Sequence, residues 1–590
     1  MNLSDRKNRI IILFSAVPAF YIMFAGLLTL PLVFGLGTSV CGGLSDSYGT
    51  IWQLWWKNAA KYHAADPVFC NLVNSPFGAK ITFGIQPVYE FMLFSMAKAI
   101  GEITAYNLWV MAGFVFSALA MFFLVFNLTG SLLASAFAGL AFGFSPYAVS
   151  QSSGGHIGFV MNFWLPLYVW SLLTLSKELN LRRAFVSGIF LALVTMTSLY
   201  YGFFTIVFSV FFLIFHLVRI QKDTPDHYAG KKLIDRCFIV LVSAVIIMIP
   251  FYWKTIPALL AGFADPAGSY HRNLNLYQLV NYSARPWDYF LPPIDNPFLG
   301  HLTEKFVRGH LHGSNVHEQA LYLGWTLILL CLAGFFMAVK GYLSEGRRRY
   351  FWFFFSGAVV MAFISGPPYF PACGTRIPLV SWFLYSIAPM FRVYARIGVF
   401  VMLCMAGIAG LVLSELGDRI KIPWKKASFF CIVVFFLLFE LSSSNSLLVD
   451  VSKTPAVYSW LSEQKQDFSV AEYPMAISID YNHYAYLFWQ RLHRKRLVNG
   501  APEGSVQDKI RQKLENLNDP MTPVMLRKMG VKYIIIHAER YIEGRVPGPM
   551  KRYYPDEISS QQFNNGVVPV PGGKFVLEKD FGVDRIYLVK

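Results

Sequence analysis

The sequence is poor in charged residues. Asp, Glu, Lys and Arg make up 14% of its 590 residues, whereas 55% are hydrophobic. A soluble protein usually carries about 25% charged residues to cover its surface. The composition therefore excludes a disordered, collagen-like or coiled-coil chain, and it predicts an α-helical polytopic membrane protein.

Cysteine is also scarce, and one nucleotide-binding motif is missing. Seven cysteines exclude a disulfide scaffold, although Cys41 and Cys70 share one predicted outer loop where a disulfide could form. The sequence lacks Gly-x-x-x-x-Gly-Lys-Ser/Thr, which disfavours an ATP-driven transporter. His310, His312 and His317 lack the spacing and cysteine partners of a zinc site, so we predict no structural metal.

Long apolar stretches occupy the first three quarters of the chain. Each is long enough to cross about 30 Å of hydrocarbon as a helix. We count eleven, near residues 10–35, 106–126, 131–147, 157–176, 184–199, 202–218, 237–253, 319–339, 350–366, 396–416 and 427–446. An odd number of spans places the two ends of the chain on opposite sides of the membrane.

The basic residues indicate which side is the cytoplasm. Five short linkers on one side carry 19 of the 51 Lys and Arg residues: Arg6, Lys7, Arg9; Lys177, Arg182, Arg183; Arg219, Lys222, Lys231, Lys232, Arg236; Lys340, Arg347, Arg348, Arg349; and Arg419, Lys421, Lys425, Lys426. Cytoplasmic loops hold the Lys/Arg excess of membrane proteins. We therefore expect a cytoplasmic N-terminus, with the first stretch an uncleaved span rather than a signal peptide.

Composition divides the chain near residue 447. Residues 1–446 are predicted to form a transmembrane domain, and 447–590 a soluble extracytoplasmic domain of α/β or α+β type. Short β-branched runs at 532–537 and 585–590 predict strands, and 507–517 predicts a polar helix.

Three predicted outer loops are long, namely 36–105, 254–318 and 367–395. Long ordered loops are often functional, so we expect a site at the outer membrane face. Trp52, Trp55 and Trp56 recur at helical spacing and are typical of a helix that lies in the headgroup layer.

Asp46 comes just before this tryptophan-rich segment. One interpretation is that its carboxylate faces a substrate that reaches it along the membrane surface. The alternative is that Asp46 caps a helix that begins near Ser47. The two roles are compatible.

A series of short motifs runs along nearly the whole chain. In order they are Asp46-Ser-Tyr48 with Ile51-Trp-Gln-Leu-Trp-Trp56, Gly155-His-Ile-Gly-Phe159, Trp164-Leu-Pro166, Trp287-Asp-Tyr-Phe-Leu-Pro292, Glu318-Gln-Ala-Leu-Tyr-Leu-Gly324, Pro389-Met-Phe-Arg392 with Arg396, Leu497-Val-Asn-Gly500, and Leu526-Arg527 with Gly530-Val-Lys-Tyr533. With these motifs in this order, the chain resembles the GT-C superfamily of integral-membrane glycosyltransferases, and more narrowly its bacterial YfhO-like branch. The family's first loop often reads Gly-Asp-x-x-Asp. Here Gly43 replaces the first Asp, so one carboxylate of a two-carboxylate metal site is missing.

The resemblance implies a function at the outer face of the bacterial cytoplasmic (inner) membrane. A sugar, hexosyl or pentosyl, would move from a polyprenyl-phosphate carrier to an envelope glycan or lipid acceptor. The implied partners are this donor, the acceptor and membrane lipids, with no nucleic acid. No cofactor is certain, and a divalent cation is left open.

Chemistry suggests roles for the matching residues. Asp46 is the candidate general base, because a hydroxyl acceptor must lose its proton as it attacks. Arg392 and Arg396 stand one helical turn apart and are the candidate clamp for the lipid phosphate. The alternative is that both arginines reach to lipid headgroups.

Glu318, Asp288 and His156 are candidate substrate contacts. Each also has a structural interpretation. Glu318 could be a helix-start carboxylate, Asp288 could pair with Arg285, and His156 could be an interfacial histidine.

Other classes of function stay open. A flippase for lipid-linked glycans would place ionisable residues inside the spans, where this sequence has few. A polysaccharide polymerase would use outer-loop arginines, but it would not need the Asp-Ser-Tyr loop. A non-catalytic assembly protein of the same fold would tolerate the loss of the first Asp.

Overall fold

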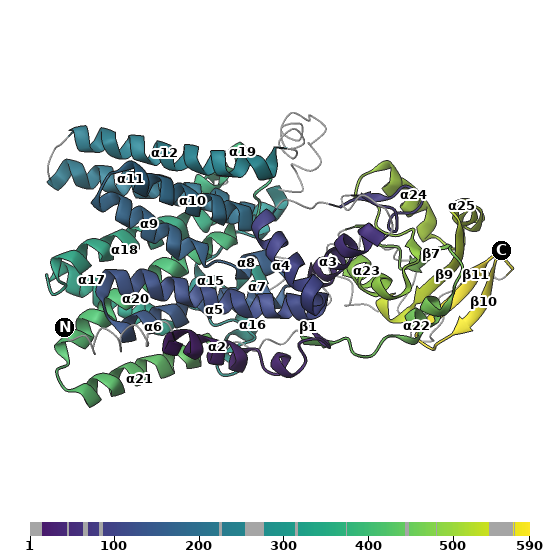
Figure 1. Cartoon of the computed structure of the whole chain (residues 1–590), viewed down its shortest axis with the longest axis horizontal. Helices are drawn as coiled ribbons and strands as arrows, with labels where there is room; N and C mark the ends of the chain where they lie inside the picture. Colours follow the sequence, from purple (N-terminus) through teal and green to yellow (C-terminus); the bar gives the residue numbers. More distant parts are fainter. Residues whose placement is uncertain are drawn as a thin grey trace. The chain divides into compact units, whose positions relative to one another are not determined.

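A computed structural model describes residues 15–43, 46–62, 69–81, 86–223, 227–253, 276–312, 317–372, 375–442, 448–478, 481–541, 570 and 573–590. The chain forms two compact units, each built from segments that are distant in sequence. Unit 1 comprises Met1–Phe34, Gly84–Phe91 and Leu108–Ser446, and unit 2 comprises Gly35–Phe83, Met92–Asn107 and Leu447–Lys590. Figure 1 shows the helices and strands of both units and labels many of them.

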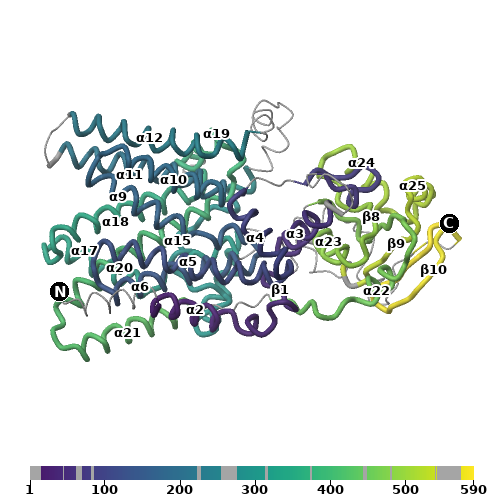
Figure 2. The backbone as a smooth tube through the Cα atoms, in the orientation of Figure 1, coloured from purple at the N-terminus to yellow at the C-terminus, as the bar shows by residue number. Residues whose placement is uncertain are grey.

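Unit 1 is a bundle of apolar helices. They are α2 (Val17–Leu28), α6 (Leu132–Gly143), α7 (Pro146–Ser153), α8 (Ile157–Val160), α9 (Trp164–Lys177), α10 (Leu181–Thr197), α11 (Leu199–Asp223), α12 (His227–Tyr252), α15 (Pro286–Phe290), α16 (Gly300–Gly309), α17 (Trp325–Val339), α18 (Glu345–Ser365), α19 (Val380–Ile387), α20 (Gly398–Arg419) and α21 (Pro423–Leu441), together with most of α5 (Glu102–Thr129). The backbone trace in Figure 2 shows α11 and α12 side by side.

Helix α20 lies at the centre of this bundle. From Gly398 to Leu413 it is buried and apolar all round, as a helix inside a core has to be, and α6, α17 and α18 pack against it. Gly410 allows one of these close contacts, because a Cβ there would come within 2.6 Å of Val125 Cγ1 on α5.

Six helices of the described residues are long and apolar enough to cross a membrane. They are Glu102–Thr129, Leu132–Ser153, Ile157–Lys177, Leu199–Gln221, Tyr228–Tyr252 and Tyr394–Arg419. Each coincides with a predicted span, so the protein is a multi-pass membrane protein. The other predicted spans fall on α2, α10, α17, α18 and α21, which are shorter or carry charged ends. The total of eleven stays a prediction.

Unit 2 is built around a five-stranded mixed sheet in the order β10-β11-β9-β7-β8. The strands are β7 (Ser469–Tyr473), β8 (Arg496–Leu497), β9 (Val531–His537), β10 (Phe575–Asp580) and β11 (Asp584–Val589). Strand β7 runs parallel to β8 and β9, whereas β11 is antiparallel to both β9 and β10. Every residue of β7 is buried, which is typical of a strand covered on both faces.

Four helices accompany the sheet: α22 (Ala456–Glu463), α23 (Tyr481–His493), α24 (Val506–Glu515) and α25 (Thr522–Lys528). Helix α24 starts at a serine cap, since Ser505 Oγ accepts a hydrogen bond from Asp508 N at 3.1 Å. The strands predicted at 532–537 and 585–590 and the helix predicted at 507–517 are confirmed as β9, β11 and α24.

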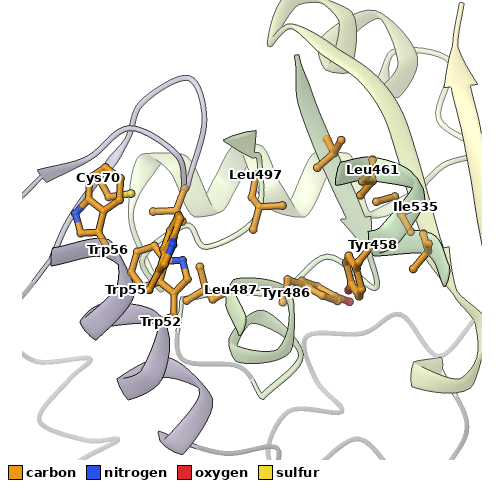
Figure 3. Close-up of a cluster of buried hydrophobic side chains, with 14 of the residues drawn as sticks. Trp52, Trp55, Trp56, Cys70, Tyr458, Leu461, Tyr486, Leu487, Leu497 and Ile535 are labelled. Atoms are coloured by element: carbon orange, nitrogen blue, oxygen red, sulfur yellow. The ribbon is translucent and has the colours of Figure 1, made fainter. Parts of the chain in front are cut away.

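The tryptophan-rich segment forms α3 (Asp46–Tyr62), and it packs into unit 2. Trp52 and Trp56 are 2% and 0% exposed. Figure 3 shows these rings beside Leu487 of α23 and Leu497 of β8, in one hydrophobic cluster. Because the indoles are buried in a protein core, the prediction that α3 lies in the headgroup layer is wrong.

The predicted boundary near residue 447 coincides with the start of the last segment of unit 2, but two earlier segments belong to a different unit than predicted. Residues 35–83 and 92–107 were assigned to the transmembrane domain by composition, but they belong to the same compact unit as 447–590. The reason is that α3 contributes its apolar face to the core of unit 2.

Candidate functional site

Asp46 is the first residue of α3, and its side chain is exposed. The strand before it, β1 (Ser39–Cys41), pairs with β6 (Leu448–Asp450). Gly42 and Gly43 then turn the chain at φ 93° and 58°, a left-handed region that favours glycine. Asp46 therefore follows a paired strand and a tight turn.

The turn is fixed by hydrogen bonds on both sides of residues 44 and 45, which lie outside the described residues. Asn107 Oδ1 accepts from Cys41 N at 3.2 Å, and Asn107 Nδ2 donates to Ser39 O at 2.6 Å. Ser47 Oγ donates to Gly43 O at 2.7 Å. These bonds hold the backbone that carries Asp46.

The opposite side of α3 is anchored to α23. Tyr48 stacks on Phe488 with ring centroids 4.2 Å apart. Trp52 Nε1 donates to Gln490 Oε1 at 2.9 Å, so this buried indole is satisfied inside the core. Helix α3 is thus a rigid support with one acidic side chain at its exposed end.

Both interpretations of Asp46 agree with this geometry. The helix begins at Asp46, where the helix dipole stabilises a carboxylate. The same carboxylate is exposed, as a group that takes a proton from a substrate has to be.

Glu318 and Arg396 form a buried ion pair in unit 1. Glu318 belongs to the short 3₁₀ helix η4 (His317–Gln319), and Arg396 to η5 (Tyr394–Ile397). They are 2% and 9% exposed. Arg396 Nη2 donates to Glu318 Oε1 at 2.5 Å, and Arg396 Nε lies 3.1 Å from the same oxygen. The pair ties two loop segments together.

Two further side chains complete the surroundings of Glu318. Gln151 Nε2 donates to Glu318 Oε2 at 3.2 Å, and Gln151 Oε1 accepts from His156 Nδ1 at 2.8 Å. His156 Nδ1 lies 3.7 Å from Glu318 Oε1. The structure therefore brings together three of the predicted residues, Glu318, Arg396 and His156. Sequence reasoning missed Gln151, whose signal was a polar run before the Gly155-His motif.

Electrostatics favour the charged form of Glu318. Burial alone would raise its pKa, but Arg396 and His156 hold the pKa below its ordinary value. The Arg396 guanidinium also lies over two rings, 3.9 Å from the centroid of Phe159 and 4.7 Å from that of Tyr200. Charge and aromatic contacts thus satisfy Arg396 from several sides.

Burial lowers the pKa of the neighbouring His317 to about 4, and His156 adds to this effect. His317 Nδ1 is 3.4 Å from Ser150 Oγ, and its backbone carbonyl accepts from Gln151 Nε2. The sequence pattern relates His317 only to metal binding and does not indicate its place beside Glu318.

Arg392 differs from Arg396. It is half-buried and precedes η5, in a non-helical stretch. Its backbone N–H donates to Tyr200 Oη at 3.4 Å. The prediction that the two arginines lie one turn apart on a helix is therefore wrong, because helix α20 begins only at Gly398 and a 3₁₀ turn comes before it.

Asp288 belongs to a separate polar cluster on α15. Asp288 Oδ2 accepts from Arg285 N at 2.7 Å and from His312 Nε2 at 3.1 Å. The expected partnership with Arg285 exists, but it uses the backbone, because the Arg285 guanidinium donates to Ser283 O and Val280 O.

No cluster of metal ligands occurs among the described residues, where groups of three His, Cys, Asp or Glu side chains were sought. Cys41 and Cys70 are buried thiols, and no disulfide joins them.

Comparison with known proteins shows the fold. No protein-family model and no curated protein matches the sequence. The archaeal oligosaccharyltransferase AglB from Archaeoglobus fulgidus, solved with an inhibitory peptide and a dolichol-phosphate, is similar over 98% of this chain and 74% of its own, at 13% identity and a TM-score of 0.53.

Two other structures of the Archaeoglobus fulgidus oligosaccharyltransferase agree. The complex with Zn and sulfate has 12% identity and a TM-score of 0.52, over 97% of this chain and 73% of its own. The form tethered to an acceptor peptide has 12% identity and a TM-score of 0.51, over 98% and 74%. The chain therefore has the fold of these oligosaccharyltransferases, while membership of the GT-C superfamily and of its YfhO-like branch stays a prediction.

Proposed function

We propose that this protein is a membrane glycosyltransferase. It moves a sugar from a polyprenyl-phosphate carrier to an envelope glycan or lipid acceptor at the outer face of the cytoplasmic membrane. Asp46 is its general base. The fold supports the proposal by analogy, since AglB with this fold was solved with a dolichol-phosphate. Fold alone does not define an activity, because the activity depends on the residues of a site.

The observation that carries the proposal is the placement of Asp46. Its carboxylate is exposed at the first residue of α3, while the other side of that helix is buried in a core. Catalytic groups work best on rigid elements that hold them within a fraction of an ångström. Asp46 combines such a support with access to a substrate.

The reaction is a substitution at the anomeric carbon. The acceptor oxygen forms a bond to this carbon as the bond from the carbon to the lipid phosphate oxygen breaks. Asp46 takes the acceptor's proton, and the phosphate leaves with the electron pair of the broken bond. General base catalysis of this kind contributes about 10²–10⁴-fold to a rate.

The departing phosphate needs a cation. We assign this contact to Arg392 of unit 1, which is half-buried and lies two residues before η5 in the sequence. Arg396 already donates two N–H groups to Glu318, so it is the poorer ligand for a second anion. We assign Arg396 and Glu318 to holding η4 and η5 in position, with His156 and Asp288 as further substrate contacts.

The test uses a strain in which the gene is deleted and then restored as variants. Mass spectrometry then measures the composition of the envelope glycans in each strain. We expect Asp46→Asn to leave the glycan as incomplete as the deletion does, at unchanged protein level. The matched control is Asp450→Asn, since Asp450 is an exposed acid on β6 of the same unit.

Each outcome decides between functions. Loss of the glycan in Asp46→Asn and its retention in Asp450→Asn support the proposal. Full restoration by Asp46→Asn would overturn it and would favour a non-catalytic assembly protein. An unchanged glycan in the deletion strain would exclude both.

A further inference from the structure

The chain that leads into α15 contacts the ends of two long helices of unit 1. Tyr282 O accepts a hydrogen bond from Ala395 N at 2.8 Å, in η5 just before α20. Ala284 N donates to Ser365 O at 2.8 Å, at the last residue of α18. The basic linkers that are predicted to face the cytoplasm lie at the opposite ends of both helices. Helix α15 therefore lies at the ends of these helices that are predicted to reach the outer membrane boundary.

Helix α16 is held next to the end of a third helix, α21. Asn296 Nδ2 donates to Glu440 O at 2.7 Å, in the last turn of α21. The Phe298 ring stacks on Phe439 of the same turn, with ring centroids 4.8 Å apart. The basic start of α21 is again at the other end of that helix. The chain thus enters α16 at the same predicted boundary.

A groove of about 540 Å³ lies between α15 and α16. It is lined mainly by Trp287, Phe290, Leu291, Leu302, Thr303 and Phe306. None of the described residues that line it is charged, and Thr303 Oγ1 donates to Pro292 O at 2.9 Å. Leu302, Phe290 and Phe306 are 69%, 51% and 42% exposed. So many exposed apolar side chains in one place indicate an apolar partner.

The two sides of α16 differ in polarity. Leu302 and Phe306 are four residues apart, so they lie on one side of the helix, and both line the groove. On the opposite side Arg308 Nε lies 2.8 Å from Glu304 Oε1, and both side chains are exposed. Lys305 is exposed as well. A helix with leucine and phenylalanine on one face and basic residues on the other is typical of the headgroup layer of a membrane.

We propose that α15 and α16 dock on the outer leaflet of the membrane, and that the groove between them holds an acyl chain of a phospholipid. A methylene group is similar in size to a water molecule, which takes up about 30 Å³, so the groove has room for a segment of such a chain. The charged residues of α16 are Lys305, Arg308 and one acid, Glu304. This excess of positive charge suits the lipid phosphate, which the flexible Lys305 side chain can reach from the edge of the layer. The position in the headgroup layer that the sequence predicts for α3 thus falls to α16.

The test uses the full-length protein in vesicles of phosphatidylethanolamine and phosphatidylglycerol. The photoreactive amino acid p-benzoylphenylalanine replaces Leu302 in the groove or, as the matched control, Glu304 on the opposite side of α16. Both positions are exposed, so neither change disturbs a core. After illumination, mass spectrometry measures the yield of protein with a bound phospholipid. We expect about 10-fold more of this adduct from position 302 than from position 304, because only the apolar side of α16 enters the acyl layer.

Two outcomes of this experiment would overturn the proposal. Equal yields at the two positions would mean that α16 does not lie on the membrane with one side. A cross-link from position 302 to a peptide of this chain or of a second copy would mean that protein covers the groove.

A double variant tests the docking without a probe. Leu302→Gln with Phe306→Gln removes the apolar side of α16, and His301→Gln with Glu304→Gln is the matched control on exposed polar positions. Amide hydrogen exchange of α16 is measured in the same vesicles. We expect about 10-fold faster exchange in the apolar double variant than in the control, since each large apolar side chain favours burial strongly. Equal exchange in the two variants would contradict docking.

A last arm distinguishes a phospholipid from the sugar carrier of the proposed function. Polyprenyl phosphate is added to the vesicles as a minor component, and the photoreactive protein with the probe at position 302 is illuminated. We expect its adducts to contain the polyprenyl chain only in proportion to its share of the lipids. Strong enrichment of the polyprenyl adduct would overturn the phospholipid as the occupant of the groove.

Discussion

Asp46 and Glu318 are both candidate site carboxylates, but Asp46 is exposed to solvent whereas Glu318 is buried. Asp46 is exposed at the start of α3. Glu318 is 2% exposed and receives hydrogen bonds from Arg396 and Gln151. A base has to reach the group that gives up the proton, and the exposed side chain of Asp46 can do this. Glu318 cannot, because its proton would have to displace a buried guanidinium.

The difference assigns the two carboxylates to different tasks. In Glu318 the charge is used to hold η4 and η5 together, and its pKa is kept low by Arg396 despite burial. For Asp46 we propose the role of general base, while hydrophobic contacts hold α3 in the core of unit 2. Each of the following predictions tests one side of this contrast.

The largest effect is expected at Glu318. Glu318→Ala leaves the buried Arg396 without its counter-charge, which costs about 3–5 kcal/mol in the free energy of unfolding. Thermal unfolding of the purified protein measures the loss. The double variant Glu318→Leu with Arg396→Leu removes both charges, and we expect it to be much closer to the wild type. A loss below about 1 kcal/mol in Glu318→Ala would contradict the assignment.

The support below Asp46 is tested at Trp52. Trp52→Phe removes the indole N–H and leaves Gln490 Oε1 unsatisfied in the core, which costs about 1–3 kcal/mol. Trp55→Phe is the matched control on the same helix, where the side chain is 8% exposed. Amide hydrogen exchange in α3 and α23 of the full-length protein measures the loss of stability in both variants. Equal exchange in the two variants would mean that α3 is anchored by packing alone.

A pH dependence is expected at His317. Burial lowers its pKa to about 4, so the folded protein stays unprotonated there when the unfolded chain takes up a proton below about pH 6.5. Stability therefore falls as the pH drops from 6.5 towards 4, by about 1 kcal/mol per pH unit. His317→Gln should reduce this slope, as thermal unfolding between pH 7.5 and 4.5 would show. An unchanged slope would place the acid sensitivity elsewhere.

The smallest effect is expected at an exposed pair. Arg308 Nε lies 2.8 Å from Glu304 Oε1 on α16, but the two side chains are 66% and 48% exposed. Glu304→Ala should cost less than about 0.5 kcal/mol, since solvent screens such pairs. A cost near that of Glu318→Ala would show that burial does not separate the two kinds of ion pair.

Local patterns in the sequence predicted local structure well. The runs at 532–537 and 585–590 are short and β-branched, and they form β9 and β11. Six of the apolar stretches form helices long enough to span a membrane. These features depend on neighbours in sequence, which a reader of the sequence sees directly.

Long-range packing was harder to predict. The spacing of Trp52 and Trp56 indicated an apolar helix face, but it did not say whether lipid or protein covers that face. The partner, α23, lies more than 400 residues further along the chain. In the same way, the sequence indicates Glu318, His156 and Arg396 only as separate candidate substrate contacts, because the ion pair of Glu318 with Arg396 depends on how η4 and η5 meet. The spacing of Arg392 and Arg396 places them on one face only if the segment is an α-helix. The chain forms a 3₁₀ turn there instead, so that prediction failed.

The most direct test is the transfer rate of the purified Asp46→Asn variant. The donor is a synthetic polyprenyl-phosphate hexose or pentose, the acceptor is an envelope extract, and release of the lipid phosphate is followed. We predict a rate about 10²–10⁴-fold below the wild type at an unchanged unfolding temperature, with Asp450→Asn at the wild-type rate. A folded Asp46→Asn protein that transfers sugar as fast as the wild type would contradict the account.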